Sequence, residues 1–488
     1  MGRLIFADES VQKYLSKLVA DGSWNIGLVI GQQGQGDGSQ RDYVIHVART
    51  PEPVEDVADI ESENEAEEED SNKEMRSVPR PASLEDANEL WVSTHAKQTT
   101  KMLPGGMSVI GLFAIAPPKM MEASQAKLRQ LLYAVHRSVD KGRILQSKGQ
   151  NMMDRILVQI CSQTRKLTCR TLDVNYHLST YRAAEWKYQS ILDRFIRLET
   201  RVAINLSLPV PLDTAKQNLS KQIKTSLTPY CNNIWESLAT VNKQMRNLDQ
   251  TLEFTDSKKG RLTKGSTTHH KYVVDLFLSA TSDKGITSGP VLSECGARMQ
   301  ISGAISGRAF VHNKATVNEG IEAIKQDVIR SLSSRCQLLC EDINVIEEDR
   351  VANLHELYDT PKRVFAHVPG FPITFCDYAF KDETNKDIME RYSELLDIRL
   401  QEENLELEAE SFLDDEDRDD MLKAEDSASC EGRTSAPPPN VDSVSHSSSA
   451  GSLLSEPGAG VRAIGVVASG ALAAVIAGMS YLYLGTES

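Results

Sequence analysis

The chain has 488 residues, of which 40% are hydrophobic and 25% are charged, and this length allows two or three domains with cores of their own. Its formal net charge of −15 is concentrated in two acidic runs, residues 55–74 and 402–426, and the rest of the chain is mildly basic. The sequence has no dense stripe of Lys and Arg, which excludes a typical nucleic-acid-binding protein. The eight cysteines are scattered without a Cys-x-x-Cys pair, a pattern that favours reduced cytosolic thiols over a disulfide framework.

The first part of the chain, residues 1–180, is predicted to form one α/β unit. An acidic loop over residues 51–83 interrupts it and has too few large apolar side chains to fold. A helix is expected after this loop, with Ser83 as its N-cap. From the hydrophobic periodicity, the predicted elements in chain order are strand 3–6, helix 9–20, strands 26–30 and 43–48, helix 84–102, strand 107–116, helix 121–139, and strands 155–162 and 166–173.

A second α+β domain is predicted over residues 185–400. Its expected strands cover residues 197–208, 271–279, 298–312 and 363–377, and a charged helix is expected from residue 386. Helix 214–227 is expected to end before Pro229. An apolar stripe at spacings of three and four then predicts another helix, packed on its own sheet or offered to a partner: Ile234, Leu238, Val241, Met245, Leu248 and Leu252.

Cys336 and Cys340 lie one turn apart on a strongly amphipathic helix that is predicted between Val317 and Leu339. A pair of thiols at this spacing could bind a metal ion together. The alternative, which we expect, is two buried thiols that pack as small apolar side chains. The histidine pair His269-His270 borders a polar stretch, where we expect a solvated loop.

The last long apolar run, residues 463–484, predicts a membrane anchor. It carries no charge, and a helix of this length spans roughly 33 Å at about 1.5 Å per residue, close to the hydrocarbon thickness of a bilayer. Gly470, Ala474 and Gly478 recur every fourth residue and indicate either a helix-packing face or an anchor without a partner. The anchor residues are Ala463, Ile464, Val467, Leu472, Val475, Ile476, Leu482 and Leu484.

Residues 402–460, before this span, are predicted to be a disordered tether, which is first acidic and then rich in Ser, Pro and Gly. Because the span lies near the C-terminus, we expect a tail-anchored protein whose bulk stays in the cytosol. The sequons at Asn205 and Asn218 are then chance matches, and their glycosylation would contradict this topology.

Familiar catalytic motifs, such as the Walker A loop, Gly-x-Ser-x-Gly and His-Glu-x-x-His, are absent from the sequence. One strand nevertheless resembles the core of the MPN domain, the fold of JAMM zinc isopeptidases. In active members this strand reads Gly-x-x-His-x-His-Pro. Residues 111–117 read GLFAIAP here, so Ala114 and Ala116 occupy both histidine positions.

The earlier strand over residues 27–31 resembles the Gly-Leu-Leu-x-Gly strand of the same family, and Trp24 stands near the place of the catalytic glutamate. Methyl groups cannot coordinate zinc, and a missing general base cannot activate water. The resemblance therefore implies an MPN-like domain that has no catalytic residues, no metal and no cofactor.

Five further segments follow in order along the chain: DYVIHVARTP (42–51), MLPGGMSVIGLFAI (102–115), CRTLDV (169–174), WKYQS (186–190) and FCDYAFKDE (375–383). With these segments in this order, the sequence closely resembles the odr-4 family. The resemblance implies an endoplasmic-reticulum membrane protein that helps to deliver odorant and other seven-helix receptors. It also implies a non-enzymatic adaptor that recruits the ubiquitin-fold-modifier protease to the membrane.

Two other classes of function stay open as alternatives. An active peptidase or hydrolase with an unrecognised site would be favoured by bound zinc or by cleavage of a modifier substrate. A fusion factor of the SNARE type would need heptads that run directly into the membrane, and residues 427–460 contain none.

Overall fold

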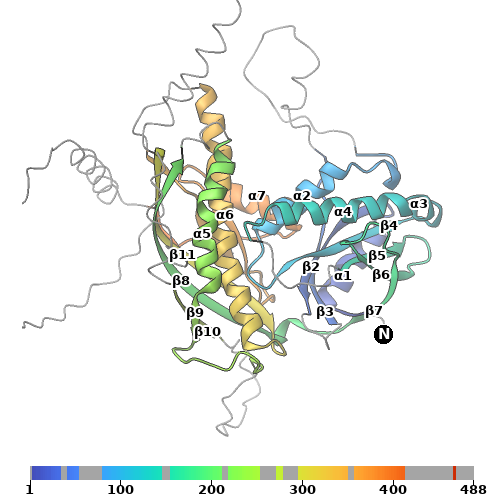
Figure 1. The fold of residues 1–488 in the computed structure, drawn as a ribbon. Helices are drawn as coiled ribbons and strands as arrows, with labels where there is room; N and C mark the ends of the chain where they lie inside the picture. The colour runs from blue at the N-terminus through green and yellow to red at the C-terminus, as the bar shows by residue number, and fades with distance from the viewer. Residues whose placement is uncertain are drawn as a thin grey trace, which may run out of the picture.

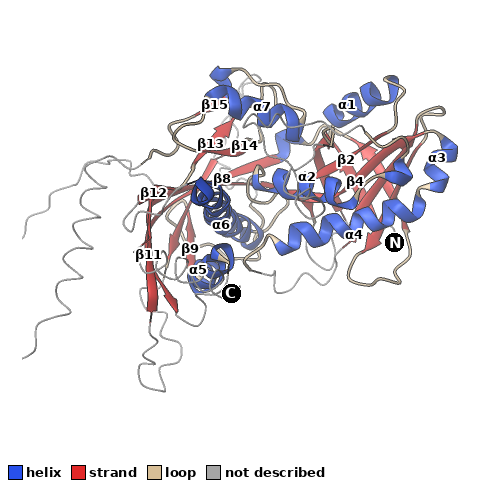
Figure 2. Cartoon of the chain, turned by 90° about the horizontal axis from the view of Figure 1, so that it is seen from above, coloured by secondary structure: helices blue, strands red, loops and turns tan. Residues whose placement is uncertain are grey.

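The computed structural model describes residues 3–34, 41–53, 80–145, 154–211, 218–252, 271–278, 295–349, 357–412 and 465–468. These residues form a mixed α+β structure, as the sequence predicts (Figure 1). A closed β-barrel with its helices forms one part, and an open sheet covered by two long helices forms the other. A small third sheet packs beside both parts (Figure 2).

The barrel follows the order β1-β3-β2-β4-β5-β6-β7, and β7 closes it by pairing in parallel with β1. It therefore includes a strand beyond residue 180, where the sequence placed the end of the first domain. Helix α1 buries one apolar face against the barrel, and its bounds confirm the predicted helix 9–20. The strands are β1 (Arg3–Ala7), β2 (Asn25–Gln33), β3 (Arg41–Arg49), β4 (Ser108–Ala116), β5 (Asp154–Cys161), β6 (Leu167–Asp173) and β7 (Arg182–Tyr188), and the first helix is α1 (Glu9–Ala20).

Two predicted barrel helices are each divided in the structure. The predicted helix 84–102 is a short 3-10 turn, Leu84–Asp86, followed by α2 (Glu89–Lys101). Ser83 is the N-cap residue of the 3-10 turn, as predicted, but its side chain makes no capping hydrogen bond to the backbone. The N-cap of α2 is Asn88, whose side chain accepts a hydrogen bond from the backbone N–H of Leu90. The predicted helix 121–139 is α3 (Pro118–Ala123) followed by α4 (Gln125–Lys141).

The open sheet has the order β12-β16-β11-β8-β10-β9 and is built around a long antiparallel pair, β8 and β11. Helices α5 and α6 lie side by side against it, and their apolar residues form a core with those of the two long strands (Figures 1 and 2). The elements are β8 (Phe195–Pro211), α5 (Leu219–Glu236), β9 (Leu238–Val241), β10 (Lys271–Phe277), β11 (Cys295–His312), α6 (Val317–Asp349), β12 (Leu357–Asp359) and β16 (Gly465–Ala468).

The predicted helix that carries the stripe from Ile234 to Leu252 is wrong. Helix α5 continues through Pro229 and ends at Glu236, and the edge strand β9 follows at once. Asn242 and Lys243 then take positive φ angles of 51° and 61°, which a helix cannot contain. The repeating spacing of the apolar residues was therefore coincidental.

The third sheet, in the order β14-β13-β15, returns the chain to the barrel. The predicted strand 363–377 is a hairpin here, and α7 follows it. Phe375 and Tyr392 belong to the same apolar cluster as the barrel residue Leu112, so this segment packs with the first unit although the sequence assigned it to the second domain. The elements are β13 (Lys362–Ala366), β14 (Phe375–Ala379), α7 (Asn385–Leu396) and β15 (Leu405–Glu406).

The predicted start of the disordered tether at residue 402 is wrong, and residues 413–460 of the prediction lie outside the described residues. Residues 402–412 are described and contribute β15, and Glu410 is only 4% exposed. The acidic composition predicted disorder, but Glu410 forms an ion pair with the buried Arg335. This positive charge offsets the cost of burying the carboxylate.

Most of the predicted membrane span, including Gly470, Ala474 and Gly478, lies outside the described residues. Four of its residues, Gly465–Ala468, form β16 in place of a helix and pair antiparallel with β11 and β12. Among the described residues, no helix combines the length and the hydropathy that a membrane crossing requires. The anchor therefore stays a prediction.

Candidate functional site

The two alanines at the predicted zinc-ligand positions lie on β4, and neither is exposed. Ala114 pairs with Ile26 on β2 and with Gln159 on β5. Alternate residues of a strand point to the same side, so Ala114 and Ala116 enter one apolar cluster, together with Ile26 and Leu128. Methyl groups offer no lone pair to a metal ion. Within the described part of the chain, no three His, Cys, Asp or Glu side chains are grouped closely enough to hold an ion.

Trp24, near the expected place of the catalytic glutamate, belongs to the same cluster and is 9% exposed. The guanidinium carbon of Arg80 lies 4.2 Å from the centre of the Trp24 ring, and Arg80 Nη2 donates a hydrogen bond of 2.6 Å to the Trp24 carbonyl oxygen. Burial lowers the pKa of Arg80. The structure thus brings Trp24, Ala114 and Ala116 into one packed cluster, with a cation over the indole ring.

Cys336 and Cys340 on α6 are 3% and 1% exposed, and they belong to the same apolar cluster as Cys231 on α5. This confirms the prediction of buried thiols. Burial raises the pKa of Cys340 to about 12, so this thiol stays protonated at neutral pH. A protonated thiol is a poor metal ligand, and these residues are best described as core.

The barrel joins the open sheet through a Pro-Gly-Gly turn that precedes β4. The Gly105 N–H donates a hydrogen bond of 2.8 Å to the Arg308 carbonyl oxygen, and the Phe310 N–H donates one of 2.8 Å to the Gly105 carbonyl oxygen. A Cβ atom at Gly105 would lie 2.4 Å from the Ala323 carbonyl oxygen on α6. Gly106 has a φ of 77°, which favours glycine. Both glycines are therefore needed for the close contact between the two parts.

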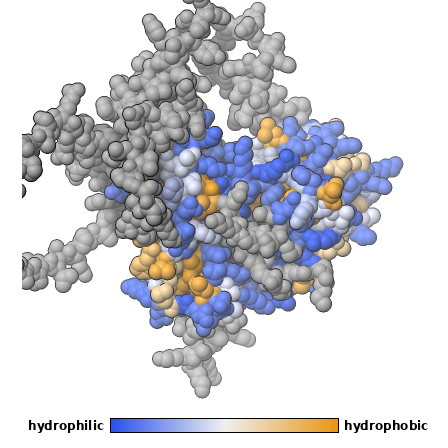
Figure 3. Space-filling view, in the orientation of Figure 1, coloured by the Kyte–Doolittle hydropathy of each residue, from blue (hydrophilic) through white to orange (hydrophobic). Residues whose placement is uncertain are grey.

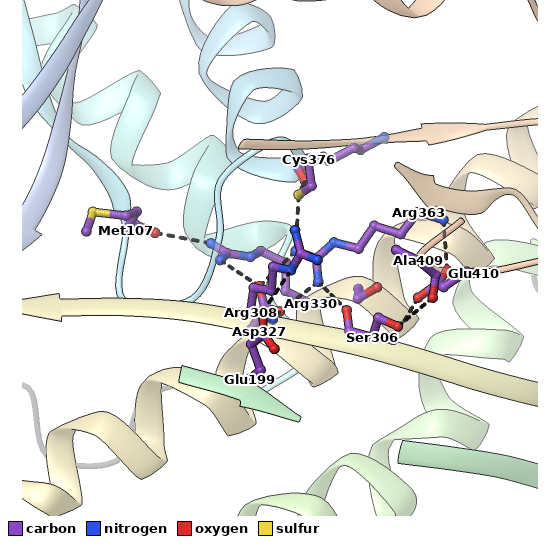
Figure 4. Close-up of polar contacts among 12 residues, drawn as sticks. Met107, Glu199, Ser306, Arg308, Asp327, Arg330, Arg363, Cys376, Ala409 and Glu410 are labelled. Carbon is purple, nitrogen blue, oxygen red and sulfur yellow. Dashed lines mark hydrogen bonds and ion pairs between the residues drawn. The ribbon is translucent and has the colours of Figure 1, made fainter. Parts of the chain in front are cut away.

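Charged side chains are buried where this turn meets α6 and β13 (Figure 4). Arg363 and Asp327 are 1% and 0% exposed, and they form two hydrogen bonds of 2.7 and 2.9 Å. Asp327 Oδ2 also accepts a hydrogen bond of 2.8 Å from the Arg308 N–H on β11. Burial alone would lower the pKa of Arg363, but Asp327 raises it well above its ordinary value. This ion pair links α6, β11 and the third sheet.

Glu410, at the end of the described tail, binds the same junction. Its carboxylate accepts hydrogen bonds from Arg335 Nη2 at 2.7 Å, from the Ser306 N–H at 2.7 Å and from the Arg363 N–H at 2.8 Å. Arg335 is 1% exposed, so the pair is fully desolvated. The acidic tail is thereby fixed to α6, β11 and β13 at one point.

The family model for ODR4-like proteins, described as "Odorant response abnormal 4-like", matches residues 27–407. The chain belongs to the ODR4-like family. It is 32% identical over 419 residues to the human "Protein odr-4 homolog", a match that covers 84% of this chain and 87% of that protein. It is 33% identical over 416 residues to the Gallus gallus homolog, with coverages of 84% and 87%.

A more distant relative is the Caenorhabditis elegans "Odorant response abnormal protein 4", which is 21% identical over 323 residues and is covered to 65%, as is this chain. Among solved structures, the crystal structure of UfSP from C. elegans matches with a TM-score of 0.40 and 11% identity. That match covers 81% of this chain and 57% of the UfSP chain.

This ODR4-like chain has a cavity of about 530 Å³ between its two parts. Helices α2 and α4 of the barrel form one wall, and α5 and α6 form the other. Four cationic side chains line it, with Glu236 as the acid among the lining residues: Lys97, Lys101, Arg143 and Arg330. Periodicity could not predict this cavity, because its walls come from helices that lie far apart in the sequence.

An apolar surface lies at the β9 edge of the open sheet. Leu238 on β9 pairs with Phe277 on β10, and these side chains are 65% and 56% exposed. Val273 on β10 is also 45% exposed. Figure 3 shows hydrophobic side chains gathered in the lower left of the molecule, where Figure 1 places β9 and β10.

The ODR4-like fold depends on charged residues that the sequence analysis did not single out. Asp327 and Arg335 stand in the apolar pattern of α6, and a charge in such a position was an available signal of a buried ion pair. Nothing local connected them to Arg363 or Glu410. Of the predicted anchor residues, Val467 falls in β16, and the others lie outside the described residues.

Proposed function

We propose that this ODR4-like protein is a non-enzymatic, tail-anchored adaptor at the endoplasmic-reticulum membrane. In this role it assists the trafficking of seven-helix, odorant-type receptors and recruits the ubiquitin-fold-modifier protease. The observation that carries the proposal is the filled site on β4, where Ala114 and Ala116 have no exposure and pack against apolar neighbours. A site without ligands, base or open volume can support binding through its outer surfaces but not hydrolysis.

The family membership supports the receptor part of this proposal, because a relative carries the name "Odorant response abnormal protein 4". The resemblance of residues 111–117 to the zinc-binding strand of MPN domains supports the protease part. MPN modules commonly pair with one another, so a domain that lost its ligands retains a surface for such pairing. Anchoring the adaptor and a receptor client in one membrane raises their effective concentration without new contacts.

Co-precipitation from detergent-solubilised membranes tests the adaptor role. We expect the full chain to capture the ubiquitin-fold-modifier protease and seven-helix receptors, as identified by mass spectrometry. The purified chain should cleave no modifier substrate, and Ala114→His with Ala116→His should not create activity. Cleavage by the wild-type chain alone would establish the alternative, an active peptidase with an unrecognised site.

The anchor is tested separately by deletion of residues 463–484. We expect the full chain in the membrane pellet and the deleted chain in the soluble fraction, because the uncharged run supplies the bilayer-spanning length. Retention of the deleted chain in the pellet after a carbonate wash would contradict the anchor. Glycosylation at Asn205 or Asn218 would instead place the body of the protein in the lumen.

A further inference from the structure

The cavity between α2, α4, α5 and α6 contains more positive charge than its surroundings compensate. Arg330 on α6 donates a hydrogen bond of 3.3 Å from Nη1 to the Met107 carbonyl oxygen, and its buried Nε has no hydrogen-bond partner among the described residues. Its Nη2 lies 3.6 Å from Asp327 Oδ1. Both oxygens of Asp327 already accept shorter bonds from Arg363 and from the Arg308 N–H. Arg330 therefore shares a carboxylate that is already occupied.

The other cations of the cavity are similarly under-compensated. Lys97 and Lys101 both pair with the exposed carboxylate of Glu341, at 3.9 and 3.7 Å. Burial lowers the pKa of Lys101. Burial also lowers the pKa of Arg143. The negative charge of Asp140 opposes this lowering, and the positive charge of Arg330 adds to it. Several cations thus face one partly enclosed volume, and an anion that enters it would regain the interactions lost through desolvation.

The walls of the cavity indicate what kind of anion would fit. Trp235, Ile144 and Ile329 supply apolar surface, whereas Thr228, Asn232 and Gln326 supply hydrogen-bonding groups. The volume of about 530 Å³ lies within the range of ~300–1,000 Å³ that is usual for ligand pockets. A lipid acyl chain would need a continuous apolar wall, whereas a peptide backbone needs donors and acceptors next to apolar side-chain contacts.

We propose that this cavity binds an acidic peptide segment that carries an apolar side chain and belongs to a partner protein. Carboxylates of the segment would pair with Lys101, Arg143 and Arg330, and its apolar side chain would contact Trp235. The site lies outside the filled cluster around Ala114. The proposal rests on the adaptor role for the presence of a protein partner, but not on membrane anchoring.

Fluorescence anisotropy with the purified full chain in detergent tests the proposal. The probe is a short labelled peptide rich in Asp and Glu with a central Leu-Phe pair. Two matched peptides replace either the acids with Lys or the Leu-Phe pair with Ser-Ser. We expect saturable binding of the first peptide and at least about tenfold weaker binding of the other two, since both charge and apolar contact are required.

Two variants separate charge from volume. Arg143→Glu should weaken binding by about tenfold or more because it reverses a lining charge. Ser333→Trp should abolish binding for a different reason, because its side chain fills the cavity without changing the charge of the lining. Arg137→Glu is the matched control, since Arg137 is exposed on α4, six residues before Arg143, and does not line the cavity. The affinity of this variant should stay within about twofold of the wild type. Thermal unfolding of each variant checks that it folds.

The proposal would be overturned if folded Arg143→Glu and Ser333→Trp bound the acidic peptide with the affinity of the wild type. Absence of saturable binding of the acidic peptide, or preference for the Lys peptide, would overturn it as well. Displacement of the peptide by short-chain phosphatidylserine, but not by unlabelled peptide, would assign the cavity to lipid and would also overturn it. This assay contains no protease or receptor. Its failure is therefore distinguishable from failure of the co-precipitation that tests the adaptor role.

Discussion

Asp327 serves three partners at the scale of single residues: its carboxylate binds the Arg363 guanidinium twice, accepts from the Arg308 N–H and lies near Arg330. We expect Asp327→Ala to destabilise the protein by about 3–5 kcal/mol, because it leaves the buried Arg363 charge without its partner. Urea unfolding followed by circular dichroism measures this change.

The matched comparison is the double variant Asp327→Leu with Arg363→Met, which removes both charges together. It should be less destabilised than Asp327→Ala, since no buried charge is left unpaired. If Asp327→Ala unfolds at the same urea concentration as the wild type, the ion pair contributes nothing and the junction is held by apolar packing alone.

His95 on α2 gives the stability a pH dependence. Its Nε2 lies 2.9 Å from the Leu395 carbonyl oxygen near the end of α7, and burial lowers its pKa from 6.5 to about 4. The unfolded chain therefore binds one more proton between these values, so stability falls as the pH falls from 6.5 towards 4 by up to about 1.4 kcal/mol per unit. Above pH 6.5 this contribution is complete.

Urea unfolding at a series of pH values between 5 and 7 measures the slope. His95→Gln, which keeps a donor near Leu395 but cannot titrate, should reduce the slope by up to about one proton. The slope should not vanish, because burial also lowers the pKa of His136 and His312 to about 4. An unchanged slope in His95→Gln would show that His95 is not the residue that titrates.

The Pro-Gly-Gly turn is decisive at the scale of elements, because it sets the distance between the barrel and α6. Gly105→Ala places a methyl group 2.4 Å from the Ala323 carbonyl oxygen. Because this oxygen belongs to the backbone of α6, the backbone has to shift to relieve the contact. We expect a loss of about 1–3 kcal/mol and faster proteolysis between the two parts. Gly142→Ala is the control, since its Cβ would meet its nearest atom, the Val139 carbonyl oxygen, at 3.5 Å. Equal thermal midpoints for the two variants would contradict this account.

Elements that are stabilised locally were predictable from sequence. Helix α1 has an Asp8 cap, Glu9 in its first turn and one apolar face, and its bounds agree with the prediction. The apolar spacing after Ile234 was misleading, because a turn with positive φ angles follows β9 and periodicity carries no signal for it. Of the candidate site, sequence located the alanines on β4. The cavity and the ion pairs depend on contacts between distant segments, which no local pattern encodes.

In the whole molecule, the chain passes more than once between the barrel and the open sheet. It leaves the barrel after β7, builds the open sheet, and returns with β14 and α7 to complete the barrel-side core. We expect a fragment of residues 1–194 to fold poorly, because it lacks Phe375 and Tyr392, each of which contributes on the order of 1.5–3 kcal/mol by burial. Residues 1–412 should fold cooperatively.

Near-ultraviolet circular dichroism and binding of the dye ANS compare the two fragments. Strong dye binding and a weak aromatic signal are expected for residues 1–194 alone. A cooperative transition in that fragment, with the midpoint of residues 1–412, would show that the returning segment is dispensable for the barrel.

The anchoring of Glu410 beside Arg335 and Arg363 affects how deletion experiments on this protein are interpreted. A truncation made a few residues too early, at the start of the acidic run, would remove a counter-charge from the interior and would look like the loss of a binding motif. Truncations intended to map partners should therefore retain the chain at least through Phe412, so that the Glu410 carboxylate stays with Arg335 and Arg363.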